Sequence, residues 1–334
     1  MRVFLTGGTG LVGSHLAERL RARGDEVVAL QRPGSDTAFL ESVGCRIVRG
    51  DVEDSTESLA VAMEGSDAVV HGAALIYAGL PWDKIEAVNV AGTSRVLKAA
   101  AQAGARTAVH LSSVATYGGQ LGRVDESTRI DTPVPASDFY ARSKREAEAA
   151  AREVSRETAL PVTMLRPSAI YGARDRLFAP ILARLTRLPL IPLLGTGETS
   201  LPVVYAGNVA AAAEAAIDSP PAIMEGVPPV AVYNVGQDYP IGVRELLELF
   251  ATGLGRRARF VRIPKGVVRT GAKLIERVGG ALPGAGDLPV TRAAMLATED
   301  NPYLTEAIRR ELGWTPPHTH REGVAATTEW LRRQ

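Results

Sequence analysis

What the chain lacks already excludes several classes of protein. Its single cysteine, Cys45, permits no intramolecular disulfide and has no evident histidine partner for nucleophilic catalysis, as suits a reducing compartment. The 38 lysines and arginines are balanced by 37 acidic residues, so there is no broad positive field for nucleic acid. No apolar run approaches the roughly 20 residues needed to span a bilayer, and strand-like sequence begins at residue 2, where a signal peptide would lie. We therefore expect a cytoplasmic protein with no nucleic-acid partner and no integral membrane segment.

Apolar, strand-like runs alternate with helical patterns through the first half of the chain. This alternation predicts an α/β fold of the Rossmann type, a doubly wound parallel sheet with helices on both faces. Beyond Pro167 the regularity is lost, and prolines and glycines multiply. We expect a dinucleotide-binding domain at 1–166, rejoined by some later segments, and a smaller mixed α/β substrate lobe with C-terminal helices at 167–334. The predicted strands are 2–6, 26–31, 46–49, 68–71, 107–112 and 162–166, and the predicted helices are 11–23, 35–43, 55–63, 83–103, 138–158 and 174–187.

Glycines recur at positions 7, 10 and 13, directly after the first predicted strand. Gly7 allows a tight turn, Gly10 lets the backbone approach a pyrophosphate, and Gly13 permits close packing of the following helix on the strand. The phosphates would then meet the helix N-terminus. Strand, spacing and helix agree, which favours dinucleotide binding over a merely flexible loop. The expected cofactor-binding residues of this loop are Thr6, Gly7, Gly10, Leu11, Val12 and Gly13.

The end of the second predicted strand, Gln31 followed by Arg32, bears on the choice of cofactor. NAD usually meets an acidic residue at this place, which accepts hydrogen bonds from the adenosine ribose. A carboxylate would repel a 2′-phosphate, whereas an arginine can bind it through charge-assisted hydrogen bonds. The pair therefore favours NADP(H) over NAD(H). The alternative is that Arg32 is an ordinary exposed arginine in a turn.

Further cofactor-binding candidates follow the third and fourth predicted strands. Asp51, next to Val52, could accept a hydrogen bond from the adenine amino group, or could serve as an acid near a helix N-terminus. The small residues Ala73 and Ala74 leave room for a cofactor against the backbone. We expect Asn89 to hydrogen-bond the backbone between strands, which is a supporting task at the same edge.

Tyr140 and Lys144 stand four residues apart in a predicted helix, so the phenol and the ammonium lie on one face, one turn apart. An adjacent ammonium favours the phenolate and lowers a tyrosine pKa from its ordinary value of about 10. Tyr140 can therefore act as a general acid or base on a ketone or an alcohol. Ser113, just past the fifth strand, can donate to the substrate oxygen from the crevice where such sheets bind ligands. Ser112 is the competing candidate, and capping of the loop is an alternative role for both.

These motifs stand in a characteristic order along the chain. They are Thr6-Gly7-x-x-Gly10-x-x-Gly13, Asp51, His71-x-Ala73-Ala74, Asn89-x-x-Gly92-Thr93, Ser113, Tyr140-x-x-x-Lys144 and Leu165-Arg166-Pro167-Ser168-x-x-Tyr171-Gly172. In this order and spacing they resemble the extended short-chain dehydrogenases/reductases of the NAD-dependent epimerase/dehydratase superfamily, over essentially the whole chain. The resemblance implies that Ser113, Tyr140 and Lys144 form the catalytic triad.

The same resemblance implies where the cofactor and a second subunit lie. Pro167 and Ser168 would be near the nicotinamide, and Lys144 would hold the nicotinamide ribose. Hydride from the nicotinamide would reduce a ketone while the tyrosine supplies the proton. A homodimer would form through the helices at 83–103 and 138–158.

The substrate class depends on the segment from Gly195 to Ala210. Sugar-nucleotide epimerases of this superfamily usually carry an arginine there and then an aspartate; here the arginine is missing and Asn208 replaces the aspartate. The run from Tyr205 to Ala210 is similar to the 3β-hydroxysteroid dehydrogenase-like branch. We therefore expect interconversion of a ketone and a secondary alcohol on a steroid-like or acyl-chain molecule. The alternatives are a sugar-nucleotide epimerase, dehydratase or reductase with tightly held NAD(P), and a non-catalytic dinucleotide sensor.

Three features of the second half need a structure to interpret. A set of apolar residues could line the substrate pocket or pack in the core. The segment 267–278 could be an ordinary amphipathic surface helix, a roof over the pocket, or a helix resting on a membrane. His318-x-His320 has no partner ligands in the sequence, so we expect no metal site. The apolar residues are Leu188, Ile191, Leu193, Leu194 and Leu201.

Overall fold

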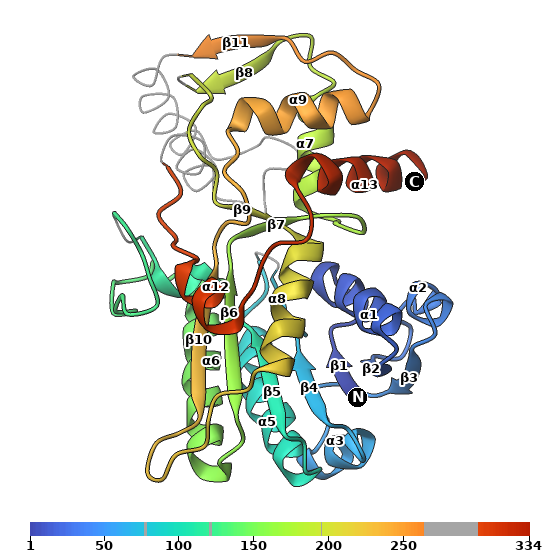
Figure 1. Cartoon of the computed structure of the whole chain (residues 1–334), viewed down its shortest axis with the longest axis vertical. Helices are drawn as coiled ribbons and strands as arrows, with labels where there is room; N and C mark the ends of the chain where they lie inside the picture. Colours follow the sequence, from blue (N-terminus) through green and yellow to red (C-terminus); the bar gives the residue numbers. More distant parts are fainter. Residues whose placement is uncertain (77–78, 120–121, 195, 264–299) are drawn as a thin grey trace.

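A seven-stranded parallel β-sheet forms the centre of the computed structural model, which describes residues 1–76, 79–119, 122–194, 196–263 and 300–334. The strand order is β10-β6-β5-β4-β1-β2-β3, the 3-2-1-4-5-6 order of a dinucleotide-binding sheet with β10 added at one edge (Figure 1). This order confirms the predicted Rossmann-type fold. The strands are β1 (Arg2–Thr6), β2 (Glu26–Gln31), β3 (Arg46–Arg49), β4 (Ala68–His71), β5 (Thr107–Leu111), β6 (Val162–Pro167) and β10 (Val230–Val235).

The strands are apolar because helices cover both faces of the sheet. In β1, Phe4 and Leu5 are completely buried, as a central parallel strand requires. All six strands expected from the sequence are present, and none of their ends differs by more than one residue. Parallel register brings the strand ends to one edge: Thr6 lies opposite His71, and His71 lies opposite His110.

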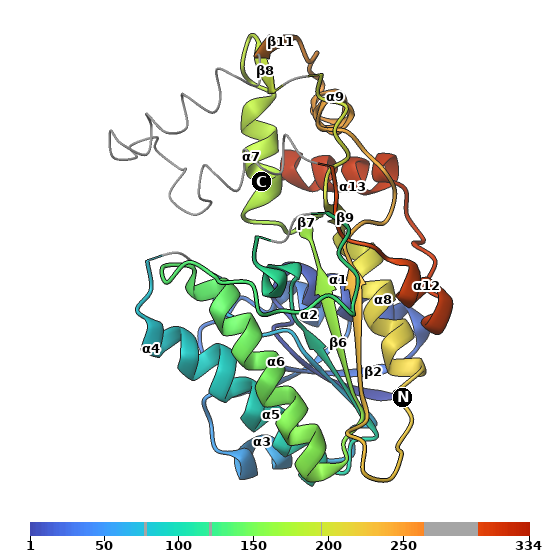
Figure 2. The ribbon, with the colours of Figure 1, turned by 90° about the vertical axis from the view of Figure 1, so that its left-hand side faces the viewer.

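Two layers of helices enclose the sheet. α1 (Leu11–Arg23) and α8 (Ala206–Asp218) cover one face (Figure 1). α3 (Thr56–Met63), α5 (Gly92–Gln102) and α6 (Phe139–Thr158) cover the other (Figure 2). The alanine side chains of α8 let this helix pack closely on α1. Because α8 and β10 come late in the chain, the dinucleotide-binding unit is completed by segments that return from the second lobe.

The helix expected at 83–103 is not continuous. It consists of α4 (Trp82–Ile85), a π-helical turn (Glu86–Ala91) and α5. In the wider π-helical turn the side chain of Asn89 is buried and hydrogen-bonded to the backbone of Leu75. Turns of this kind inside α-helices are frequently found at functional sites. Leu75 follows β4, so this interruption lies at the carboxyl edge of the sheet.

Two other predicted helices are shorter in the structure. The helix expected at 35–43 spans only Ala38–Ser42 (α2). The helix expected at 174–187 spans Phe178–Leu185 (α7), because the buried carboxylate of Asp175 accepts hydrogen bonds from its first backbone amides and caps it there.

A smaller lobe lies beyond the carboxyl edge of the sheet (Figure 1). The helix expected at 267–278 falls outside the described residues. Within the described ranges, no helix is long and apolar enough to cross a bilayer. The elements of the lobe are the strand pairs β7 (Ala169–Tyr171) with β9 (Val203–Tyr205) and β8 (Ile191–Leu194) with β11 (Phe260–Ile263), and the helices α7, α9 (Val243–Gly253) and α13 (His320–Arg332); α12 (Glu306–Leu312) packs beside α8 and β10.

Four of the five apolar residues considered for the substrate pocket divide into two groups; the side chain of the fifth, Leu194, lies outside the part that the structure describes. Ile191, Leu193 and Leu201 are buried in the core of the second lobe, together with Tyr171. These three therefore pack the lobe. Leu188, by contrast, is 43% exposed at the end of α7.

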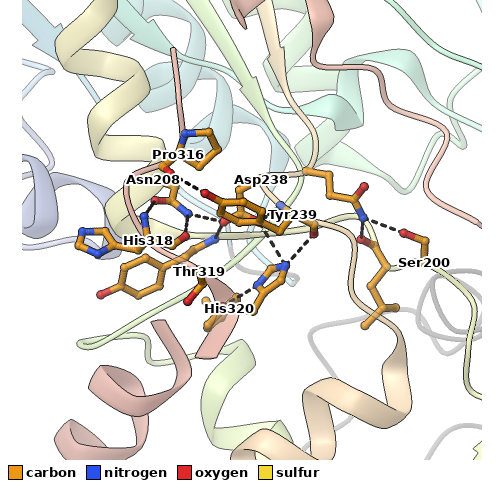
Figure 3. Close-up of polar contacts among 12 residues, drawn as sticks. Ser200, Asn208, Asp238, Tyr239, Pro316, His318, Thr319 and His320 are labelled. Atoms are coloured by element: carbon orange, nitrogen blue, oxygen red, sulfur yellow. Dashed lines mark hydrogen bonds and ion pairs between the residues drawn. The ribbon is translucent and has the colours of Figure 1, made fainter. Parts of the chain in front are cut away.

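The C-terminal segment is fastened to α8 by Asn208 (Figure 3). The side-chain nitrogen of Asn208 donates to the carboxylate of Asp238 at 2.6 Å and to the carbonyl oxygen of His318 at 2.7 Å. Its side-chain oxygen accepts from the backbone amide of His318 at 3.0 Å. An aspartate at this position could not donate, and it would set a second negative charge against Asp238. The asparagine that departs from the epimerase pattern thus has a structural task.

The second histidine of the His318-x-His320 pair lies in a protein network. Its ring nitrogens contact the hydroxyl of Tyr171 and the carbonyl oxygen of Tyr239, both at 2.8 Å. Among the residues that the structure describes, no group of three or more His, Cys, Asp or Glu could hold a metal ion. We assign His320 to the packing of α13 on the lobe, while the backbone of His318 is held by Asn208 of α8.

Candidate active site

The loop between β1 and α1 has the shape predicted for a phosphate-binding turn. Gly7 has a positive φ of 72°, which disfavours other residues. A Cβ on Gly13 would lie 2.2 Å from the carbonyl oxygen of Gly7, so only glycine lets α1 start this close to the turn. No side chain caps α1 at Gly10, and the amides of Leu11 and Val12 have no partner within the helix. Such amides are ready donors for a pyrophosphate.

A buried donor without a partner lies beside this loop, at the end of β2. The side-chain nitrogen of Gln31, Nε2, is buried and forms no hydrogen bond with the described residues. A Cβ on Gly8 would lie 2.9 Å from this nitrogen. Buried polar atoms are normally paired, and the adenosine ribose meets this position in dinucleotide-binding folds, so the residues present fit that ligand.

Two exposed arginines flank the same place. Arg32 follows β2 directly, and Arg49 ends β3 in register with Gln31. The guanidinium of Arg49 donates to the carbonyl oxygen of Arg32 at 3.3 Å. The sequence pattern indicates Arg32 as a candidate for binding a 2′-phosphate but does not indicate Arg49, because the two arginines are brought together only by the pairing of β2 with β3.

Thr6 supports the segment that follows β4. Thr6 is fully buried, and its hydroxyl accepts from the amide of Ala73 at 3.2 Å and contacts Nδ1 of His71 at 2.8 Å. The hydroxyl of Thr93 donates to the carbonyl oxygen of Asn89 at 2.6 Å and contacts Nε2 of His71 at 3.0 Å. Because the Thr93 hydroxyl gives its only proton to Asn89, it can only accept a hydrogen bond from His71, so Nε2 of His71 carries the ring proton. Burial lowers the pKa of His71 to about 3, so the ring stays neutral.

Asn89 supports the same segment from the other side. Its side-chain oxygen accepts from the amide of Leu75 at 2.7 Å, and its nitrogen donates to the carbonyl oxygen of Leu75 and the hydroxyl of Ser143, both at 2.9 Å. These bonds brace the segment against α6. Ala73 and Ala74 are half-buried there, so a ligand can approach their backbone.

Asp51 and Val52 lie beyond the end of β3. The carboxylate of Asp51 accepts from the amide of Glu53 at 3.2 Å and so stabilises its own turn, while Ser55 caps α3. Val52 is buried against Gly92 of α5. Contact of Asp51 with an adenine stays a prediction.

Tyr140 and Lys144 lie one turn apart near the start of α6, as expected, and Lys144 is buried. The ammonium donates to the carbonyl oxygen of Leu111 at 2.8 Å and lies 5.9 Å from the centre of the Tyr140 ring. Burial lowers the pKa of Lys144 to about 8, against the opposing effect of Glu148. Tyr140 is only half-buried, so its ring borders the ammonium and remains accessible.

The two serines after β5 have different surroundings. Ser112 is buried, and its hydroxyl donates to the carboxylate of Glu148 at 2.6 Å. The hydroxyl of Ser113 accepts from the amide of Ala115 at 3.1 Å and donates to none of the described residues. The proton of Ser113 is therefore available to a ligand, and the geometry favours this serine over its neighbour as the predicted donor.

Glu148 and Arg166 form a buried ion pair that the sequence reasoning missed. Two parallel hydrogen bonds of 2.8 and 2.6 Å join them, and neither side chain is more than 3% exposed. Arg166 also donates to the hydroxyl of Tyr117 at 2.7 Å. Because Glu148 also accepts from Ser112, the pair ties α6 and β6 to the serine turn. A glutamate one helical turn beyond the lysine was the available sequence signal.

Pro167 and Ser168 lie at the end of β6. Pro167 is buried, and the hydroxyl of Ser168 is buried without a hydrogen-bond partner among the described residues. Such a hydroxyl can be satisfied by a polar group of a ligand, which agrees with the position expected for the nicotinamide.

The strand order places these groups side by side. The glycine loop, the two alanines, the serine turn and Ser168 follow the ends of β1, β4, β5 and β6, which are neighbours in the sheet. The order of the chain reverses between β1 and β4, the place where open α/β sheets bind ligands. Backbone amides that can bind a diphosphate therefore lie at the same edge of the sheet as a phenol and a hydroxyl that can donate protons to a ligand. The ammonium at this edge can stabilise the phenolate that remains.

Comparisons with known proteins agree with this geometry. The chain is 30% identical over 331 residues to a 4-hydroxy-2-methyl-3-oxo-4-farnesyl-3,4-dihydroquinoline-1-oxide ketoreductase of Stigmatella aurantiaca, covering 98% of this chain and 95% of that one. It is also 30% identical over 333 residues to a 2-alkyl-3-oxoalkanoate reductase of Stenotrophomonas maltophilia, covering 97% of each.

Among solved structures, MoeE5 in complex with UDP-glucose and NAD is similar over 100% of this chain and 99% of its own, with a TM-score of 0.70 and 26% identity. Residues 3–236 match the NAD dependent epimerase/dehydratase family. With the sheet order, the glycine loop and the Tyr140–Lys144 pair, this match establishes that the chain belongs to the NAD dependent epimerase/dehydratase family, the extended short-chain dehydrogenases/reductases, and is an NAD(P)-dependent enzyme.

Proposed function

We propose that this enzyme interconverts a ketone and a secondary alcohol on a largely apolar, steroid-like or acyl-chain molecule, with NADP(H) preferred. The observation that carries the proposal is the buried ammonium of Lys144, held at 2.8 Å by Leu111 beside Tyr140. A buried cation next to a phenol is costly for stability alone, and it is useful where a phenolate must form.

The residues have distinct tasks in this reaction. Bound NADPH would supply the hydride that reduces the carbonyl carbon. Ser113 donates a hydrogen bond to the carbonyl oxygen, and the phenol of Tyr140 gives its proton to that oxygen, which leaves the alcohol. Lys144 stabilises the phenolate that remains. Oxidation of the alcohol runs through the same groups in reverse.

The cofactor would be held by groups already in place. The free backbone amides at the start of α1 would bind the pyrophosphate. The side-chain nitrogen of Gln31, which has no partner among the described residues, would meet the adenosine ribose. Arg32 and Arg49 would bind a 2′-phosphate, since both are exposed at the ends of neighbouring strands. The unpaired hydroxyl of Ser168 would face the nicotinamide end.

The apolar substrate is supported by relatives and by sequence. Two relatives that match over nearly the whole chain are named for reduction of ketones bearing farnesyl or alkyl groups. The sequence from 198 to 210 has no arginine to bind a nucleotide diphosphate. We therefore favour an alkyl-chain or polycyclic ketone over a sugar nucleotide.

A sugar-nucleotide epimerase is the second candidate, since the similar protein MoeE5 was solved with UDP-glucose and NAD. The two functions predict different cofactor behaviour. An epimerase keeps its cofactor bound and returns the hydride to the same substrate, so added NADPH would show no net consumption. A ketone reductase consumes NADPH in proportion to product.

The deciding experiment follows oxidation of NADPH and, separately, NADH with a series of 3-oxoalkanoates of increasing chain length. We expect kcat/KM to rise with chain length and to be higher with NADPH. Tyr140→Phe should lower kcat/KM by about 10²–10⁴-fold while leaving NADPH affinity unchanged. Full activity of that variant would remove Tyr140 as the acid. Copurified NAD that does not exchange, together with epimerisation of a UDP-sugar, would establish the second candidate instead.

We also propose a homodimer through α4, α5 and α6. These helices form one outer layer of the molecule (Figure 2), which supports the subunit contact that the family resemblance implies. The molar mass in solution, measured by light scattering after gel filtration, should be twice that of the 35.4 kDa chain.

A further inference from the structure

The far end of the second lobe exposes several large apolar side chains. We call it the lobe tip and define it as Ile181, residues 187–190 and Val261. Exposed fractions there are 37% for Ile181, 43% for Leu188, 54% for Leu190 and 43% for Val261. Large apolar side chains that are exposed together at one end of a folded protein can mark an interaction site.

The lobe tip is a built part of the fold. α7 leads up to it, and β8 and β11 lie beside it at the end of the molecule farthest from the sheet domain (Figure 2). Arg256 fastens the loop after α9 to the end of α7, donating to the carbonyl oxygen of Ala183 at 2.9 Å and to the hydroxyl of Thr186 at 2.7 Å. The amide of Ile191 donates to the carbonyl oxygen of Arg259 at 2.7 Å. The apolar side chains are therefore held outward by a fixed frame.

The two segments that form the lobe tip carry charge of one sign. Segments 176–197 and 249–263 contain seven arginines and neither aspartate nor glutamate, although acidic and basic residues are balanced over the whole chain. Neighbouring α9 carries two carboxylates: that of Glu248 is paired with Arg244, and Glu245 is exposed in the first turn. The arginines are Arg176, Arg184, Arg187, Arg256, Arg257, Arg259 and Arg262, and all except Arg256 are exposed.

A groove of about 340 Å³ opens at the foot of the lobe tip. Arg184, Arg187, Arg256 and Arg332 line it together with apolar side chains that include Leu254. An apolar floor below a rim of guanidinium groups suits a ligand with an anionic head and an apolar body. The groove contains none of the proposed catalytic residues.

A second apolar loop serves as an internal comparison. The loop between α8 and β10 exposes Ile223 by 67%, Met224 by 59% and Val227 by 51%. It lies at the opposite end of the molecule (Figure 1). Residues 219–229 include Glu225 and no lysine or arginine. Exposed apolar residues therefore occur at both ends, and cationic charge accompanies them only at the lobe tip.

We propose that the lobe tip docks the enzyme onto the surface of an anionic lipid bilayer. Leu188 and Leu190 enter the headgroup region, while the surrounding arginines pair with lipid phosphates and carboxylates. Interfacial binding of this kind combines buried apolar area with attraction to anionic lipid. A second copy of this chain is the poorer partner, because two arginine-rich tips would repel each other. The proposal does not depend on the function proposed above.

The test is co-sedimentation of the full chain with vesicles of phosphatidylcholine alone and of phosphatidylcholine mixed with phosphatidylserine. We expect binding to the mixed vesicles to be at least about tenfold tighter, since each arginine near an anionic surface strengthens binding roughly fivefold. About 1 M salt should abolish the difference, because it shortens the screening length to about 3 Å.

Three variants locate the contact. Leu188→Ser with Leu190→Ser, and Arg187→Glu with Arg257→Glu, should each weaken binding to the mixed vesicles by about tenfold or more. The matched control changes Ile223, Met224 and Val227 to serine and should leave binding within about twofold of the parent. All substituted side chains are exposed, so the circular dichroism spectrum and the thermal unfolding temperature should match those of the parent and show intact folding.

Several results would overturn the proposal. They are no binding to mixed vesicles, equal binding to both vesicle types, or unchanged binding of either lobe-tip variant. Self-association that is lost in the leucine variant, without vesicle binding, would assign the lobe tip to a contact between copies of this chain.

Discussion

The ammonium of Lys144 donates a hydrogen bond of 2.8 Å to the backbone carbonyl oxygen of Leu111. Leu111 is the last residue of β5, and Ser113 follows two residues later, so this bond joins the helix that carries Tyr140 to the serine turn, alongside the bonds from Ser112 to Glu148 and from Arg145 to Thr116. A neutral amine would make the same contact more weakly. Protonation of Lys144 therefore strengthens the contact between the two segments that carry the proposed catalytic groups.

The pH dependence should show Lys144 in two opposite ways. Its folded pKa of about 8 lies below the ordinary value of 10.5, so between these values the unfolded chain binds more protons and the contribution of Lys144 to stability rises with pH. Activity should change in the other direction: kcat/KM for NADPH should fall above about pH 8 as the ammonium is lost.

Urea denaturation and initial rates, measured across this pH range, provide the check. Lys144→Met should be nearly inactive and should lack this part of the rise in the free energy of unfolding. A parent enzyme whose activity stays level to about pH 10 would contradict the assigned role.

Ser113→Ala and Ser112→Ala should have different consequences. Loss of the Ser113 hydroxyl should lower kcat/KM by about 10²–10³-fold with little change in stability, because it removes a donor to the reacting oxygen. Loss of the Ser112 hydroxyl should lower the free energy of unfolding by about 1–3 kcal/mol, because Glu148 loses a buried partner. Rates and urea denaturation of both variants decide this, and the reverse pattern would exchange the two roles.

Arg32→Ala and Arg49→Ala should each weaken NADPH binding by about tenfold or more, since each removes a charged donor to the 2′-phosphate. NADH binding should stay the same, because NADH lacks that phosphate. Arg46→Ala is the matched control, an exposed arginine at the other end of β3. Equal effects on the two cofactors, measured by fluorescence titration, would remove the basis for NADP preference.

Asn208→Asp should destabilise the fold by about 2–4 kcal/mol at neutral pH, because it sets two carboxylates against each other and removes a donor to His318. The repulsion raises the folded pKa of the new carboxyl, so the deficit should shrink as the pH falls toward about 5. Adding Asp238→Asn should recover part of the lost stability, measured as a double-mutant cycle. A deficit independent of pH would show that lost hydrogen bonds, rather than charge, are responsible.

Much of the sheet domain could be predicted because its signals are local. Apolar runs of four to six residues mark the strands, and Gly7 and Gly13 satisfy a steric demand that acts between neighbouring elements. The Tyr140–Lys144 pair follows from the period of a single helix. The continuous helix expected at 83–103 was wrong in its middle, because Asn89 turns inward to partners that are distant in sequence.

The folded chain alone decided which polar groups are occupied and which are free. Ser112 and Ser113 are neighbours of the same type, and only the position of Glu148, brought over by α6, separates their roles. The side-chain nitrogen of Gln31 is free because no described residue around it in the folded chain accepts its hydrogen bond. The hydrogen bonds of Asn208 are made with a segment more than a hundred residues away. Local periodicity and glycine sterics are written in short stretches of sequence, whereas hydrogen-bond partnership between distant segments exists only once the chain has folded.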